Sequence, residues 1–100
     1  MEQTIRVEDD TAHIALTGSI HVRDAGKLRA TLISHIDQGQ KFIIIDVTRV
    51  DLIDSSGLGV LIQGQHRAAA LGGKISLTGV NGIVKEVLEL SRLDKVFDIK

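Results

Sequence analysis

The segment VDLIDSSGLGVLIQG, residues 50–64, joins the end of a predicted strand to the start of a predicted helix. Its first part carries two aspartates and two serines, residue types that often cap helix N-termini. Glycines follow at Gly57, Gly59 and Gly64, although each interior glycine costs a helix about 1 kcal/mol relative to alanine. Helix stability alone does not explain this composition, so the segment is a candidate for a functional role.

Strand and helix patterns lie on both sides of this segment. Upstream, KFIIIDV (41–47) is a continuous apolar run rich in β-branched residues, which predicts a strand covered on both faces. Downstream, LGVLIQGQHRAAALGG (58–73) has helical spacing and a glycine stop. Near the N-terminus, TIRVEDD (4–10) and TAHIALTG (11–18) alternate in polarity and predict an antiparallel hairpin whose second strand stops at Gly18.

The remaining segments continue the alternation. Residues 23–39 predict a helix that buries one stripe of side chains: Ala25, Leu28, Leu32 and Ile36. KISLTG (74–79) predicts a strand, and KVFDIK (95–100) a short final one. Residues 81–93 predict a third helix with an inward set: Ile83, Val84, Val87, Leu88 and Leu90. The order β-β-α-β-α-β-α-β predicts an α/β fold with a largely parallel sheet, in one domain over residues 1–100.

Composition excludes several classes of function. The chain has no cysteine, so disulfides and zinc ribbons are excluded. It has 12 Lys plus Arg against 13 Asp plus Glu, no basic block, and only two aromatic residues, so we expect no nucleic-acid binding. No apolar run approaches the roughly 20 residues that span a membrane, and the start is acidic. We therefore expect a cytoplasmic protein without membrane insertion.

The polar residues of the opening segment fit no common catalytic motif. The glycine spacing G-x-G-x4-G misses the dinucleotide fingerprint, and neither Ser55 nor Ser56 lies in a nucleophile elbow. The histidines, which a hydrolase would need as a base, lie on different predicted elements: His13, His21, His35 and His66. Asp46, Asp51 and Asp54 could bind magnesium, but we favour turns and an N-cap at Asp54. We expect no enzyme activity, cofactor or metal.

The helix that follows Asp54 has an unusual outer face. If Leu58, Leu61, Ile62, Gln65, Ala68 and Ala69 face the sheet, the opposite side carries Ser56, Val60, Gln63, Arg67 and Leu71, flanked by Gly59 and Gly64. A solvated face would carry more lysine and glutamate. This face predicts a docking surface, on which Gly64→Arg should weaken a complex without changing stability. Leu61 should be buried against the strand at 42–45.

Residues 47–99 closely resemble the anti-sigma factor antagonists, the stand-alone bacterial STAS domains. The resemblance rests on DSSGLG (54–59), on LELSRLDKVF (88–97) and on IALTGSI (14–20), so it spans essentially the whole chain. It implies a mixed sheet of four or five strands with an N-terminal antiparallel hairpin and about three to four helices. One departure is His21, which stands where many members have aspartate, with Asp24 three residues later.

The resemblance also implies a function. Such proteins bind a GHKL-type serine kinase that acts as an anti-sigma factor, and phosphorylation of the serine after the aspartate, here Ser55, releases them. A PP2C-type phosphatase reverses the modification. The resemblance also implies a monomer. Together with the outer helix face, the resemblance implies that these residues contact the partner: Asp54, Ser56, Gly57, Gly59, Val60, Gln63, Gly64 and Arg67. Two alternatives remain: a STAS subunit of a transporter or signalling assembly, and a nucleotide- or small-ligand-binding module.

Overall fold

The computed structural model describes all 100 residues and confirms the predicted order of elements. The elements are β1 (Glu2–Glu8), β2 (Thr11–Ile20), α1 (Val22–Asp37), β3 (Phe42–Ile53), α2 (Ser55–Ala70), β4 (Lys74–Thr78), α3 (Gly82–Leu90), the short 3-10 helix η1 (Leu93–Lys95) and β5 (Asp98–Ile99). No helix has the length and apolar composition needed to cross a membrane.

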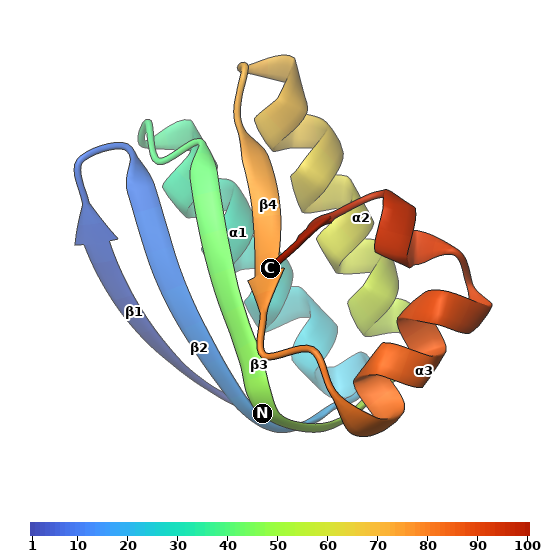
Figure 1. Ribbon diagram of the computed structural model, residues 1–100. Coiled ribbons are helices and arrows are strands. Elements are labelled where there is room, and N and C mark those ends of the chain that lie inside the picture. Colours follow the sequence, from blue (N-terminus) through green and yellow to red (C-terminus); the bar gives the residue numbers. More distant parts are fainter.

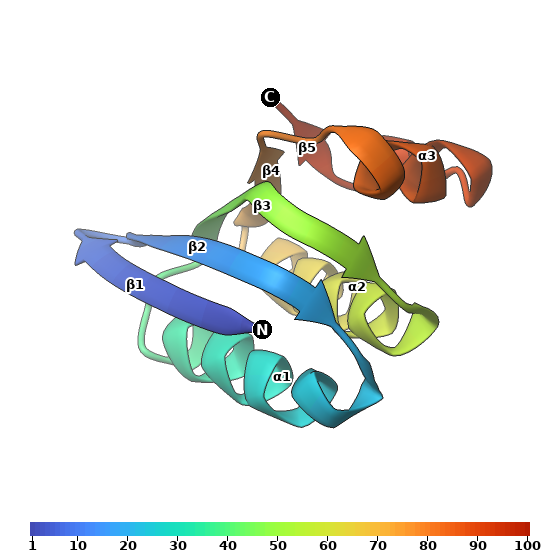
Figure 2. The same ribbon diagram turned by 90° about the horizontal axis from the view of Figure 1, so that it is seen from below.

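The five strands form one sheet in the order β1-β2-β3-β4-β5. β1 and β2 are antiparallel, as the hairpin prediction required, and the other neighbouring pairs are parallel. Figure 1 shows α1 and α2 side by side behind the sheet, and Figure 2 shows both on the same face, with α3 at the β4 end. The chain therefore has the predicted α/β fold with a mixed sheet.

The core lies between the sheet and the α1–α2 layer. The largest fully buried side chains come from β2, α1, β3, α2, β4 and α3: Ile14, Leu16, Ile20, Leu28, Leu32, Ile36, Ile43, Ile45, Leu61, Ile75, Leu77 and Leu88. The predicted buried stripe of α1 is confirmed at Leu28, Leu32 and Ile36, and Ala25 is half-buried against the same hydrophobic core. The burial of Leu61 is confirmed as well.

The prediction that the central strand is covered on both faces was wrong. Ile43, Ile45 and Val47 are buried, but Ile44 is only half-buried and Asp46 is exposed. The reason is that α1 and α2 cover one face of the sheet and leave the other open (Figure 2). On an open face, a β-branched side chain such as Ile44 still packs against its neighbours on adjacent strands.

The second strand does not stop at Gly18. β2 continues to Ile20, and its register with β3 shifts between Gly18 and Ser19. Gly18 has a φ of +85°, which glycine adopts at little cost. This glycine therefore forms an irregularity within the strand, and the extension carries β2 to the edge where α2 begins.

The third helix buries fewer side chains than predicted. Val84 and Leu88 are buried and Val87 is half-buried, but Ile83 is 51% and Leu90 86% exposed. The assignment of Ile83 and Leu90 to the core was wrong, because α3 lies at the end of the sheet and is covered on one side only (Figure 2).

Candidate functional site

Asp54 caps α2 as the sequence predicted. Its backbone is extended, with φ −91° and ψ 179°, and its Oδ1 accepts a hydrogen bond from the Gly57 amide at 3.0 Å. Its carbonyl accepts the first intrahelical bond from Leu58, also at 3.0 Å. These two bonds set the helix frame, so Ser55 is the first residue of α2.

We expect Asp54→Ala to lower the free energy of unfolding by about 0.5–2 kcal/mol, because the Gly57 amide loses its acceptor. Chemical denaturation measures this loss. Asp51→Ala is the control, since Asp51 is an exposed aspartate at the end of β3 whose loss should change stability by no more than about 0.5 kcal/mol. Equal losses in both variants would contradict the capping role.

The start of α1 lies beside the start of α2 (Figure 1). Ile20 pairs with Ile53, and the Asp54 amide donates to the Ile20 carbonyl at 3.1 Å. His21 then precedes α1, and its amide donates to Asp24 Oδ2 at 2.9 Å. That hydrogen bond is the main cause that lowers the pKa of Asp24, with a smaller contribution from the Met1 ammonium. Asp24 thus serves the start of its own helix.

The two serines differ in access. Ser55 is exposed and Ser56 is half-buried. The amides of the first helical turn have no intrahelical partners, and the helix dipole places partial positive charge there. A negatively charged group on Ser55 would therefore meet a favourable field without entering the core.

The first two glycines of α2 have different environments. A Cβ on Gly57 would lie 2.8 Å from Ile53 Cγ1 and 2.9 Å from Ile20 Cγ2, so this glycine lets α2 pack against the ends of two strands. A Cβ on Gly59 would have no atom within 4 Å. Gly59 therefore leaves open space one turn after Ser55, and another molecule could approach the helix there.

The predicted outer face of α2 was wrong at two positions, and its inner face at one. Val60 is 7% exposed and Gly64 is buried, while Ala69, expected to face the sheet, is exposed. A Cβ on Gly64 would lie 2.9 Å from Ile75 Cδ1 of β4 and 3.1 Å from Leu32 Cδ1 of α1. Because α2 packs against α1 as well as the sheet, its buried side is wider and rotated relative to the prediction.

Arg67 is exposed, as predicted, but it already has a partner. Its Nε and Nη2 donate to the two carboxylate oxygens of Asp37 on α1, each at 2.9 Å. The side-chain hydrogen bonds to Asp37 raise the pKa of Arg67 above its ordinary value. Arg67 therefore links the C-terminal parts of α1 and α2. Gln65 was predicted to face the sheet, and its Oε1 accepts a hydrogen bond from the Ile75 amide of β4 at 2.6 Å.

The accessible surface of α2 follows a different line from the predicted one. We call it the Ser55 face, and it comprises Ser55, Gly59, Ile62, Gln63 and His66, all exposed or half-buried. Their spacing of three and four residues places them on one side of the helix. Of these five residues, Gly59 and Gln63 had been predicted to contact a partner and Ser55 to be phosphorylated. Ile62 had been predicted to face the sheet; it packs partly against the core and is half-buried, so it borders the accessible face. His66, which is exposed, had been given no contact role.

The carboxylates within β3 and just after it, Asp46 and Asp54, act locally. Asp46 accepts hydrogen bonds from the hydroxyl and the amide of Thr48, and the hydroxyl bond is the main cause that lowers the pKa of Asp46. Asp54 is occupied with the helix cap. The structure contains no group of three or more histidine, cysteine or acidic side chains placed to hold a metal ion. The cap interpretation is confirmed for Asp54, whereas the turn interpretation of Asp46 was wrong, because β3 continues past this residue to Ile53.

Comparison with known proteins gives a consistent family. The family described as "Mlab, STAS domain" matches residues 4–99. BtrV of Bordetella bronchiseptica, named an anti-sigma factor antagonist, is 27% identical over 99 residues, which cover 99% of this chain and 85% of that protein.

Solved structures share the fold. TM1081 from Thermotoga maritima, described as an anti-sigma factor antagonist, has a TM-score of 0.89 at 23% identity. The match covers 97% of this chain and 84% of that one. The phosphorylated form of the Bacillus protein SpoIIAA has a TM-score of 0.80 at 23% identity, with 99% of this chain and 91% of that one covered. With its element order, its mixed sheet and a family match over residues 4–99, this chain belongs to the STAS domain family.

Proposed function

We propose that this protein is an anti-sigma factor antagonist that works as a phosphorylatable partner switch in the cytoplasm. The unphosphorylated form binds a GHKL-type serine kinase and frees the sigma factor or other target that the kinase holds. The kinase phosphorylates Ser55 and releases the antagonist, and a PP2C-type phosphatase restores it. The observation that carries the proposal is the exposed Ser55 at the first position of the capped helix α2.

The chemistry of phosphoserine supports a switch at this position. A phosphate adds roughly −1.5 to −2 charge at neutral pH. Beside the Asp54 carboxylate, this charge opposes a partner that must exclude water from the same surface. The N-terminal amides of α2 meanwhile accommodate the phosphate. Phosphorylation can therefore block binding without unfolding the domain.

The proposed contact surface is the Ser55 face together with Asp54 and Ser56 at its start. Gly59 lets the backbone of a partner come close to the helix, since a Cβ there would touch nothing in the free protein. Gly57, which had been predicted to contact the partner, is buried and instead seats α2 on the sheet. Arg67 lies further along the helix in its ion pair with Asp37. Val60 and Gly64 are no longer part of the proposed surface because they are buried.

Incubation with purified serine kinases and ATP, followed by mass spectrometry, tests the proposal. We expect phosphate on Ser55. Ser55→Ala should abolish phosphorylation yet keep kinase binding, and Ser55→Asp should weaken binding less than phosphate, because it supplies less charge and fewer acceptor oxygens. Ser56→Ala is the matched control and should still be phosphorylated.

Other results would contradict this function. Phosphate on Ser56 alone would overturn the site. A stable complex with a transporter or a larger assembly, with no phosphorylation by any kinase, would indicate the structural-subunit alternative. Tight binding of a nucleotide by the unmodified protein would indicate the ligand-binding alternative.

A further inference from the structure

The first strand, β1, is an edge of the sheet that no other element covers. It stands first in the strand order, and Figure 1 shows nothing on its outer side. Six of its seven residues are exposed, although it pairs with β2 over its whole length. The outward amides and carbonyls of an edge strand have no partner within the sheet. β1 can therefore pair with one further strand.

β1 lacks most of the features by which proteins keep edge strands from pairing. It contains no proline and no lysine, and its register with β2 runs without a bulge. The centre of the strand holds the β-branched residues Thr4 and Ile5, and Val7 follows. With seven residues, the strand is also long enough to form a ladder of several hydrogen bonds.

The side chains of β1 divide between the two faces of the sheet. Ile5 and Val7 lie opposite the buried Ile14 and Ala12 of β2, on the face that the helices cover. They are nevertheless 37% and 47% exposed, because no strand flanks them on the outer side. The open face carries the even-numbered residues, which include every charge of the strand: Glu2, Thr4, Arg6 and Glu8.

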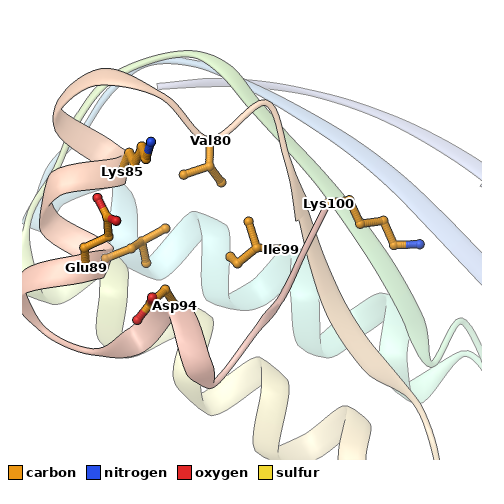
Figure 3. Close-up of a pocket in the computed structure, with 7 residues that line it drawn as sticks. Val80, Lys85, Glu89, Asp94, Ile99 and Lys100 are labelled. Carbon is orange, nitrogen blue, oxygen red and sulfur yellow. The ribbon is translucent and has the colours of Figure 1, made fainter.

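The opposite edge of the sheet offers no such strand. β5 has only two residues, and a carboxylate oxygen of its Asp98 lies 3.0 Å from Lys74 Nζ and 3.9 Å from Lys100 Nζ. A hollow of about 230 Å³ lies beside β5 (Figure 3), and its charged lining is balanced in sign: Lys85, Lys100, Glu89 and Asp94. The free strand edge is therefore at β1 alone, and pairing of β1 with β1 leaves no second edge for further copies.

We propose that a second copy of this chain pairs its β1 antiparallel to this edge, about a two-fold axis at Thr4. A two-fold axis perpendicular to the sheet keeps the open faces of both copies on one side, so even-numbered residues lie opposite even-numbered ones. With the axis at Thr4, Glu2 of each copy lies opposite Arg6 of the other, and opposite charges across a strand pair stabilise it. This dimer departs from the monomer that the resemblance implies and goes beyond the proposed function.

The other symmetric registers fit less well. An axis at Ile5 would place Glu2 opposite Glu8 of the other copy, and an axis at Arg6 would place the two arginines opposite each other. Like charges directly opposite destabilise a strand pair. Axes nearer the ends of the strand, at Gln3 or Val7, would pair only three of its seven residues. The sequence of β1 thus complements itself best about Thr4.

The remaining contacts agree with this register. Arg6 keeps its own Glu8, whose Oε1 lies 2.9 Å from Arg6 Nη1, and its five N–H donors can hold Glu2 of the other copy as well. Glu8 lies beyond the end of the other strand and has no residue opposite it. On the helix side, the two Ile5 side chains are diagonal neighbours across the axis, so the pairing also covers apolar surface.

Sedimentation equilibrium of the purified protein tests the proposal. An interface made by two edge strands is small, so we expect a weak dimer with a dissociation constant of about 1 mM or lower. Glu2→Arg and Arg6→Glu each replace two attractive cross-strand pairs with two repulsive ones and should each weaken the dimer about tenfold. Glu8→Arg is the control on the same face, and because residue 8 has no residue opposite it, association should change by less than about threefold.

A mixture of the two weakened variants should restore the pairing. In a mixed dimer of Glu2→Arg and Arg6→Glu, the arginines of one strand lie opposite the glutamates of the other at both positions. The mixed dimer should be at least about tenfold tighter than the dimer of either variant alone. A mixture of Glu8→Arg with Arg6→Glu has the same difference in net charge but leaves one repulsive pair, so it should not restore the pairing.

Several outcomes would overturn the proposal. The first is a protein that stays monomeric at about 1 mM. A dimer that Glu2→Arg and Arg6→Glu do not weaken would place the contact elsewhere, and a dimer that Glu8→Arg tightens would place the axis at Ile5. Equal recovery in both mixtures would mean that net charge, and not the register of β1, drives association. None of these readouts involves Ser55, so failure here and failure of the proposed switch are distinguishable.

Discussion

Replacing Gly64 with arginine should lower the free energy of unfolding by about 3 kcal/mol or more. The first added carbon would already press on Ile75 and Leu32, and the rest of the side chain would carry a charge into the contact between α1 and α2. Neither neighbour can move far, because both are fully buried. Urea denaturation of the purified variant measures the loss.

Gly59→Arg is the matched control on the same helix. Its side chain enters open space, and the loss of a helical glycine gains up to about 1 kcal/mol, so stability should stay equal or rise slightly. Kinase binding should nevertheless fall, since position 59 lies on the Ser55 face. A Gly64→Arg protein as stable as the original would mean that α2 is rotated as the sequence pattern had suggested.

Leu61→Ala should cost about 2–5 kcal/mol through lost burial and the cavity that remains. Leu61 is only 2% exposed and belongs to the core cluster between the helices and the sheet. Gln63→Ala, two residues along and exposed, should change stability by no more than about 0.5 kcal/mol. Thermal and urea unfolding of both variants provide the comparison, and a loss below about 1 kcal/mol for Leu61→Ala would contradict the packing.

Local sequence patterns were sufficient for the order of elements and for the helix cap. Alternating polarity predicted the β1–β2 hairpin because successive side chains of a strand point to opposite faces. The stripe of Leu28, Leu32 and Ile36 predicted α1 for the corresponding helical reason. Asp54 followed by small polar residues predicted the start of α2, since capping depends on groups only three residues apart.

The helix frame at Ser55 and Ser56, and with it the exposure of each serine, needed more than the sequence pattern. A shift of one residue in the helix frame would exchange their positions, and sequence patterns do not resolve helix ends that finely. The hydrogen bond between Asp54 and the Gly57 amide establishes the frame, and the exposed position of Ser55 follows from it.

The sequence by itself determined which segments form strands and helices, because those preferences depend on neighbours within one or two turns. Only the tertiary structure decided which sides of these elements are covered. Gly64 is buried because α1 packs beside α2, Ile44 is half-open because one face of the sheet has no helical layer, and Leu90 is exposed because α3 lies at the end of the sheet. Each outcome depends on a contact, or the lack of one, with residues far away in the chain, which periodicity within a single segment does not encode.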